Sequence, residues 1–230
     1  MNTLSPPQKI LSQILKWIVI LSATIGTFLS WHAGRDSFMG GRTVFMFFTT
    51  QSNIALAVIC LTGSVKILKD KPFTDLWYII KFVGTVAITL TGAVFCFVLA
   101  PTLGSGAWSI QSILTHVIVP VTSILDFFVT GINSNIKKRN DLWVVVPPIL
   151  YAIYAGIGYS LNWQFAEGYN YPYFFLNWGS PAGAFGFTDG LPYMGVAWWI
   201  AAIFCALLIV GMVYLLLLDV LKKLFILFFI

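Results

Sequence analysis

The chain is built from six long apolar runs separated by polar segments. About 20 predominantly apolar residues are enough for a helix to cross the hydrocarbon core of a membrane, and each of the six runs is about that long or longer. We therefore expect an all-α polytopic membrane protein, a bundle of six transmembrane helices that forms a single domain over residues 1–230. The expected spans cover about residues 10–31, 43–65, 75–100, 107–131, 141–161 and 195–218.

The longest connection, residues 162–194, joins the fifth and sixth spans. It is rich in glycine and aromatic residues, including Tyr171, Tyr173, Phe174 and Phe175. A loop of this length in a compact domain is usually functional or disordered, and Tyr and Trp prefer the boundary between lipid and water. The aromatic content favours an ordered outer loop that covers one end of the bundle.

Basic residues are divided very unevenly between the two ends of the expected spans. Eleven fall at one face, whereas only Arg35 and Arg42 fall at the other. Because cytoplasmic segments carry the excess of Lys and Arg, this asymmetry predicts that the N-terminus and the C-terminus are both cytoplasmic. The residues assigned to the cytoplasmic face are Lys9, Lys16, Lys66, Lys69, Lys71, Lys81, Lys137, Lys138, Arg139, Lys222 and Lys223.

The composition agrees with a membrane protein and excludes several partners. The chain is 59% hydrophobic and 9% charged, against about 25% charged residues in soluble domains. The net charge of +5 reflects basic loops at one face, so we expect no nucleic acid partner. Cys60, Cys96 and Cys205 lie inside expected spans without the spacing of metal ligands. We expect no metal and no cofactor.

A polar patch interrupts the second span near its outer end. Thr49, Thr50, Gln51, Ser52 and Asn53 are five consecutive hydroxyl- or amide-bearing residues between apolar flanks. Polar groups inside a membrane must find partners, which places them in the bundle interior. With the span starting near Thr43, Thr49 is expected roughly 9 Å below the outer end.

A second polar patch lies at a similar depth in the fourth span. Ser112, Thr115 and His116 fall in its outer half, with His116 roughly 13 Å from the outer end. Asp126 lies further along the same span, where it is expected to anchor the cytoplasmic half or to pair with Lys81. We expect the two patches to meet around a polar cavity that opens toward the outer side.

This pairing of residue types suggests acyl-transfer chemistry. A hydroxyl becomes nucleophilic when a neighbouring base removes its proton, and histidine titrates in the useful range. His116 is the only histidine expected inside a span, with the hydroxyls of Thr49, Thr50 and Ser52 at its depth. Gln51, Asn53 or a backbone amide could stabilise an oxyanion. The residues alone leave open a ligand or ion site, and also plain interhelical hydrogen bonding.

These motifs resemble a known family. Six spans, the element Phe48-Thr49-Thr50-Gln51-Ser52-Asn53, His116 followed by Pro120 and Asp126, and a Tyr-Pro in the last outer loop are similar to bacterial six-helix relatives of the androgen-induced transmembrane protein family. That family includes the androgen-dependent regulator of tissue factor pathway inhibitor. Its animal members hydrolyse fatty acid esters of hydroxy fatty acids with a threonine nucleophile and a histidine.

The resemblance implies a function and a location. It assigns the nucleophile to Thr49 and the base to His116, with Thr50 as the rival one residue away. Thr50, Gln51, Ser52, Asn53 and Ser112 become possible oxyanion or substrate contacts. The expected protein is a hydrolase of a membrane lipid or fatty-acyl ester in the bacterial plasma membrane. The alternatives are a non-catalytic binding or transport component that holds a small ligand in the same cavity, and a sensor or structural protein.

Several other classes of membrane protein lack their required residues. A retinal protein needs a lysine deep in a late span, but Lys222 and Lys223 are terminal. A zinc hydrolase needs three His or acidic ligands at one depth, and only one histidine is expected within the spans. The Gly-x-Ser-x-Gly element of rhomboid-like proteases is absent from the sequence.

Overall fold

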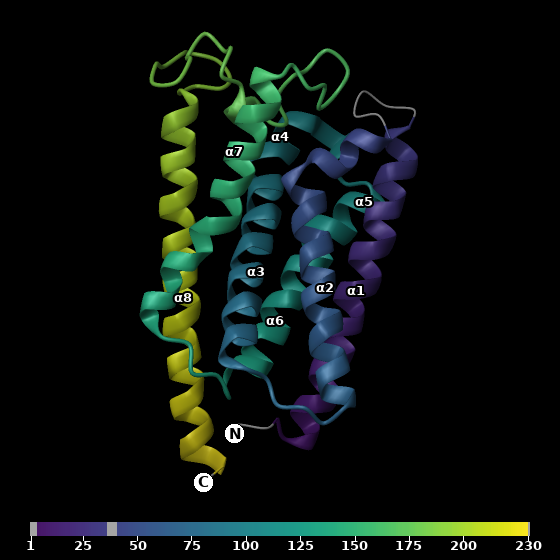
Figure 1. Cartoon of the computed structure of the whole chain (residues 1–230), viewed down its shortest axis with the longest axis vertical. Helices are drawn as coiled ribbons and strands as arrows, with labels where there is room; N and C mark the ends of the chain where they lie inside the picture. The colour runs from purple at the N-terminus through teal and green to yellow at the C-terminus, as the bar shows by residue number, and fades with distance from the viewer. Residues whose placement is uncertain (1–3, 36–40, 230) are drawn as a thin grey trace.

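The computed structural model describes residues 4–35 and 41–229 and shows a bundle of helices (Figure 1). Six of them are long and apolar enough to cross a membrane, which confirms the all-helical class and the expected number of spans. They cover Pro6–Gly34, Phe48–Leu68, Asp75–Leu103, Ile110–Gly131, Lys138–Ser160 and Val196–Leu224.

Helices α1 (Pro6–Gly34), α2 (Phe48–Leu68), α3 (Asp75–Val94) and α6 (Val119–Gly131) form the centre of the bundle. Helices α7 (Val146–Ser160) and α8 (Val196–Phe229) stand on one flank, beside α3 (Figure 1). Both ends of the described chain lie at the same end of the bundle, which we call the terminal end. Residues 162–194 lie at the opposite end, which we call the loop end.

The second span begins later than the sequence predicts. Arg42–Met46 forms the 3-10 helix η1, and Phe47 has an extended backbone, with φ −86° and ψ 142°. The α-helix therefore starts at Phe48 rather than near Thr43. Thr49 lies in the first turn of α2, where a backbone N–H has no partner within the helix.

Two adjacent spans contain a wider π-helical turn just before a proline. Phe95–Leu99 (η2) leads into the short helix α4 (Ala100–Leu103), which contains Pro101. Leu114–Ile118 (η4) follows the short helix α5 (Ile110–Ile113) and leads into α6, which begins with Val119 and Pro120. Proline has no N–H to donate and crowds the preceding turn, so each helix widens there. Such π turns are frequent at functional sites.

The fifth and sixth spans also differ in detail from their expected forms. Lys138–Val145 is a 3-10 helix (η5), and Pro147 and Pro148 stand at the start of α7. The α-helical part of the fifth span therefore begins at Val146, with the prolines in its first turn, where a missing N–H breaks no helical bond. Helix α8 continues without interruption to Phe229, whereas the sixth span was expected to end near residue 218.

The loop at the loop end is tied together by turns and aromatic packing. It contains the 3-10 helix η6 (Phe174–Leu176) and two isolated β-bridges, Ala166 with Tyr169 and Phe187 with Met194. Phe165 and Phe175 are buried, and Phe175 packs in a cluster with Tyr151 of α7 and Val196 of α8. The loop thus closes over the flank formed by α7 and α8.

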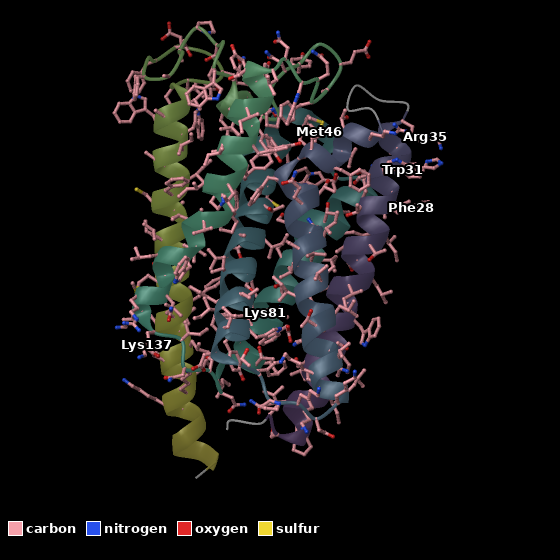
Figure 2. The ribbon with its side chains drawn as sticks, viewed as in Figure 1. Phe28, Trp31, Arg35, Met46, Lys81 and Lys137 are labelled. Carbon is pink, nitrogen blue, oxygen red and sulfur yellow. The ribbon has the colours of Figure 1, made fainter. Side chains whose placement is uncertain are left out.

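Lys16 and Lys81, which the sequence analysis assigned to the membrane surface, lie inside the bundle. Both are completely buried, and Figure 2 shows Lys81 between the central helices. Asp126 draws them inward: its carboxylate lies 2.7 Å from Lys16 Nζ and 2.8 Å from Lys81 Nζ. The predicted pairing of Asp126 with Lys81 is confirmed. The surface assignment of these two lysines was wrong.

Close approach of α3 to η4 requires a glycine at position 92. A Cβ atom there would lie 2.8 Å from the backbone oxygen of His116 and 3.1 Å from the Pro120 ring. We expect Gly92→Ala to destabilise the fold by about 1–3 kcal/mol, because a backbone atom cannot move aside cheaply. Gly156→Ala is the matched control, since a Cβ at Gly156 meets nothing within 4 Å. Thermal unfolding in detergent measures both, and equal midpoints would contradict this packing.

Candidate functional site

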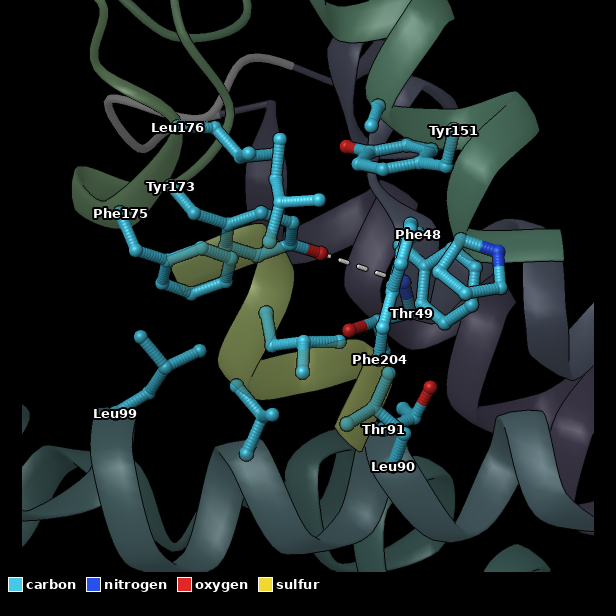
Figure 3. Close-up of a pocket in the computed structure, with 15 residues that line it drawn as sticks. Phe48, Thr49, Leu90, Thr91, Leu99, Tyr151, Tyr173, Phe175, Leu176 and Phe204 are labelled. Carbon is cyan, nitrogen blue, oxygen red and sulfur yellow. Dashed lines mark hydrogen bonds between the residues drawn. The ribbon is translucent and has the colours of Figure 1, made fainter. Parts of the chain in front are cut away.

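A narrow, mostly apolar cavity of about 60 Å³ lies under the loop of residues 162–194, between α2, α3, α7 and α8 (Figure 3). Four of the residues around it carry hydroxyls: Thr49, Thr91, Tyr151 and Tyr173. The others are apolar, contributed by Phe48, Leu90, Val94, Leu99, Pro148, Ala152, Phe175, Leu176, Ile200, Ile203 and Phe204. An apolar pocket with a few polar groups is the usual form of a ligand site.

Two tyrosines support the start of α2 beside this cavity. The backbone N–H of Thr49 donates to the Tyr173 hydroxyl at 3.4 Å, marked by the dashed line in Figure 3. The Tyr151 hydroxyl donates to the backbone oxygen of Met46 at 3.1 Å. Phe47, at the N-cap position, has no side-chain oxygen to serve this purpose. Residues of α7 and of the 162–194 loop therefore fix the turn that carries Thr49.

Tyr173 reaches the cavity from the 162–194 loop. Its ring stacks on Phe175, with centroids 5.0 Å apart, and lies edge-on to Phe47. Burial raises the pKa of Tyr173, so its hydroxyl stays protonated at neutral pH and can donate a hydrogen bond. The tyrosine thus brings a proton donor next to Thr49.

Asn53 joins the two polar patches. Its side-chain amide donates to the backbone oxygen of Thr49 at 2.8 Å and to that of Thr115 at 3.2 Å. The two carbonyl oxygens are therefore at most about 6 Å apart, because both bond the same nitrogen. The Thr115 carbonyl is available for the second bond because Pro120, one turn further along, has no backbone N–H to donate to the carbonyls of the preceding turn. The patches meet through this amide.

Ser52 links the same turn of α2 to α3. Its hydroxyl donates to the Thr49 backbone oxygen at 3.0 Å and lies 2.9 Å from the hydroxyl of Thr91. Ser52 is therefore already engaged in hydrogen bonds between helices. It positions the turn rather than offering a free hydroxyl.

His116 lies in the π turn η4, packed against the π turn η2 of the third span. Its ring stacks on Phe95 with centroids 3.8 Å apart, and Trp108 lies edge-on to Phe95. The Nδ1 atom is 3.0 Å from the Ser112 backbone oxygen and 3.1 Å from the Thr115 hydroxyl. A carbonyl can only accept, so the proton is on Nδ1 and Nε2 is the basic nitrogen.

The structure therefore separates the predicted site residues. Thr49 lines the cavity, and His116 is not among the residues that surround it. Within the described residues no hydrogen bond joins the Thr49 hydroxyl to His116; the connection runs through Asn53 and the Thr115 backbone. The cavity and the histidine lie close together but not in contact.

The remaining predicted residues take different places. Thr50 is buried but does not line the cavity, and Gln51 is exposed, donating to the Phe45 backbone oxygen at 3.2 Å. Ser112 forms the carbonyl contact to His116, and its hydroxyl pairs with that of Ser109 at 2.9 Å. Among these, Gln51 points away from the site.

Sequence reasoning missed the two side chains that complete the polar end of the cavity. Thr91 looked like an ordinary hydroxyl in an apolar span, and Tyr173 lies in the loop, 124 positions from Thr49. The Tyr171-Pro172-Tyr173 stretch was visible in the sequence, but its position against α2 depends on the tertiary fold. Tyr151 of α7 also lines the cavity.

Asn53 offers a direct test of how the patches are joined. We expect Asn53→Ala to destabilise the protein by roughly 1–3 kcal/mol, because it leaves the Thr49 and Thr115 carbonyls without this donor in a buried setting. Gln51→Ala, two positions away and exposed, serves as the control and is expected to change stability little. Unfolding of both variants in detergent measures the difference. Equal stability would show that Asn53 does not hold the helices together.

Within the residues the structure describes, no group of three His, Cys, Asp or Glu side chains is arranged to hold a metal ion. Comparison of the chain with family models, with curated proteins and with solved structures found no match.

Proposed function

We propose that the protein is an intramembrane hydrolase of lipid or fatty-acyl esters, with Thr49 as the nucleophile and His116 as the general base. The observation that carries this proposal is the position of Thr49 at the polar end of an otherwise apolar cavity. The apolar walls suit a slender acyl chain, and the hydroxyl stands where the ester group of such a chain would lie. The resemblance to the androgen-induced family supports the same assignment.

The proposed reaction is acyl transfer in two steps. Thr49 attacks the ester carbonyl, its proton passes to Nε2 of His116, and the alcohol leaves with that proton. Water then attacks the acyl-threonine, and His116 again takes and returns a proton as the acid leaves. The Tyr173 hydroxyl, which accepts the Thr49 backbone N–H, lies beside Thr49 and can donate its own proton to the oxyanion.

This mechanism requires His116 to reach the Thr49 hydroxyl when substrate is bound, directly or through one water. Catalytic hydrogen bonds are often long without substrate and tighten in the complex. The carbonyl oxygens of Thr49 and Thr115 are both bonded to the Asn53 amide, so the two turns are near enough for a small movement to bring them together. A carboxylate partner for His116 is not part of the proposal, which makes the pair a dyad.

We also propose that the loop end faces the outside and that both termini are cytoplasmic. Leaving out the buried Lys16 and Lys81, nine of the eleven basic residues first assigned to the terminal end remain there, against Arg35 and Arg42 at the loop end. This asymmetry favours a cytoplasmic terminal end, and the resemblance favours a bacterial plasma membrane. The cavity would then open toward the outer leaflet.

One observation favours a second function, the binding of an acyl chain without chemistry. The Thr49 hydroxyl and His116 share no hydrogen bond within the described residues. A binding or transport component would keep the apolar cavity and use Tyr151 and Tyr173 only to hold the polar head of its ligand.

An assay of ester cleavage separates the two functions. Purified protein in detergent is incubated with chromogenic acyl esters of increasing chain length, and release of the acid is measured by mass spectrometry. The hydrolase account expects release of acid by the wild-type protein but not by Thr49→Ala. Thermal stabilisation by a free fatty acid without any cleavage of esters would instead support the binding account.

A further inference from the structure

A second polar centre lies in the half of the bundle near the terminal end, apart from the cavity. Lys16 of α1, Lys81 of α3 and Asp126 of α6 meet there, with side-chain exposures of 0%, 1% and 0%. Charged side chains inside a membrane are costly and commonly mark proton or ion sites. This cluster plays no part in the proposed hydrolysis.

Lys16 has the hydrogen-bond partners of an ammonium ion. Its Nζ lies 2.6 Å from the Ser12 hydroxyl and 2.7 and 3.0 Å from the two oxygens of Asp126. Three acceptors match the three donors of a protonated lysine. The ring of Trp77 also lies 5.5 Å from Nζ, which favours a cation.

Lys81 bonds one oxygen of Asp126 and two neutral groups. Its Nζ lies 2.8 Å from Asp126 Oδ2. The Ser123 hydroxyl and the Cys60 sulfur complete its contacts at 3.4 and 3.5 Å. Protonated Lys81 donates to both of them. A neutral amine instead has a lone pair that can accept the S–H proton of Cys60.

The charges in this cluster do not balance. Two ammonium groups and one carboxylate leave one excess positive charge, and an unpaired buried charge is strongly unfavourable. Four helices contribute the described side chains that face the cluster: Ser12 and Lys16 from α1, Cys60 from α2, Trp77, Lys81 and Thr85 from α3, and Ser123 and Asp126 from α6. Among these, Cys60 is the one further group that can lose a proton.

We propose that Lys81 and Cys60 hold one exchangeable proton and that the cluster is an intramembrane proton-binding site. With the proton bound, Lys81 is an ammonium and Cys60 a thiol, and the cluster carries one positive charge. Release of the proton leaves the cluster neutral, either as an amine that accepts the S–H bond or as an ammonium beside a thiolate. Both neutral forms contain the same atoms and differ only in the position of one proton.

A thin aromatic layer separates this site from the surface of the protein. Phe73 stacks on Trp77 with centroids 4.0 Å apart, and both rings lie within 6 Å of Lys16 Nζ. Phe73 also lines a small surface hollow together with Lys9 and Asp70, which form an exposed ion pair. Movement of Phe73 would open a path for protons between that hollow and the cluster.

Infrared spectroscopy of the Cys60 S–H bond tests the proposal. In the Cys96→Ala, Cys205→Ala background, Cys60 is the sole remaining thiol. We expect its S–H stretching band to shift or lose intensity through a single transition between pH 5 and 10, since both neutral forms change that bond. A band that stays unchanged over this range in folded protein would overturn the proposal.

Two variants connect that transition to the charge balance. Lys81→Met removes the partner of Cys60 and leaves the Lys16–Asp126 pair neutral, so the band should lose its pH dependence. Lys16→Met leaves Lys81 paired with Asp126 and removes the excess charge, so the transition should move to higher pH. Circular dichroism confirms folding of each variant. A transition that is the same in all three proteins would also overturn the proposal.

Discussion

Replacement of Asp126 by Asn is expected to destabilise the protein far more than replacement of either buried lysine. The Asp126→Asn variant would leave two buried lysines without an anion, so each must either stay charged and unpaired or give up its proton. Removing one partner of a buried ion pair costs about 3–5 kcal/mol, and the loss of the carboxylate affects two pairs at once. We expect failure to fold or a large drop in the unfolding temperature.

The lysine variants provide the matched comparison. Lys16→Met or Lys81→Met leaves one lysine paired with one carboxylate, and the methionine fills much of the lost volume. Each lysine variant should therefore lose much less stability than Asp126→Asn, and should lose almost none where packing is retained. The measurement is thermal unfolding of the three variants in one detergent. If Asp126→Asn were as stable as the lysine variants, the charge balance would not govern this region.

Replacement of His116 by Gln is expected to lower ester turnover by about 10²–10⁴-fold, the usual contribution of a general base. Glutamine retains a hydrogen-bonding side chain near the Ser112 carbonyl, so folding should survive. Steady-state kinetics on the chromogenic esters measure the loss, which should appear in kcat rather than KM because the histidine does not line the cavity.

Thr50→Ala is the control for this experiment. Thr50 is buried and adjacent to Thr49 but is not a cavity residue, so its variant should keep most of the turnover. Full activity of folded His116→Gln would remove histidine from the mechanism. Loss of activity in Thr50→Ala with activity kept in Thr49→Ala would shift the nucleophile by one residue.

The sequence specifies the number of spans because each apolar run is long enough to cross a membrane on its own. The hydropathy pattern defines the first and last residues of each helix less clearly. Residues 43–46 belong to the same apolar run as α2, so hydropathy places them in the helix. The backbone of Phe47 is nevertheless extended, and α2 begins at Phe48. The support for this turn lies elsewhere in the chain: the Tyr151 hydroxyl donates to the Met46 backbone oxygen, and the Tyr173 hydroxyl accepts from the Thr49 backbone N–H.

The candidate site, too, was predictable from the sequence in part. A contact between the two polar patches could be predicted because buried amides and hydroxyls need partners, and Asn53 supplies a bond between them. The expected polar cavity between the patches was wrong: the cavity is mostly apolar, and its lining residues do not include the fourth span. The surroundings of His116 could not be predicted, because its ring orientation follows from two π turns and the stack with Phe95. Nor did hydropathy show that Asp126 would draw Lys16 away from the membrane surface.

The most direct test of the proposed hydrolase is covalent labelling of the purified protein by a fluorophosphonate with a long alkyl chain, followed by mass spectrometry of the labelled peptide. We predict that the label is on Thr49, and that labelling is lost in Thr49→Ala and strongly slowed in His116→Gln. Absence of labelling in folded wild-type protein, or a label on another residue, would contradict the assignment of Thr49 as the nucleophile.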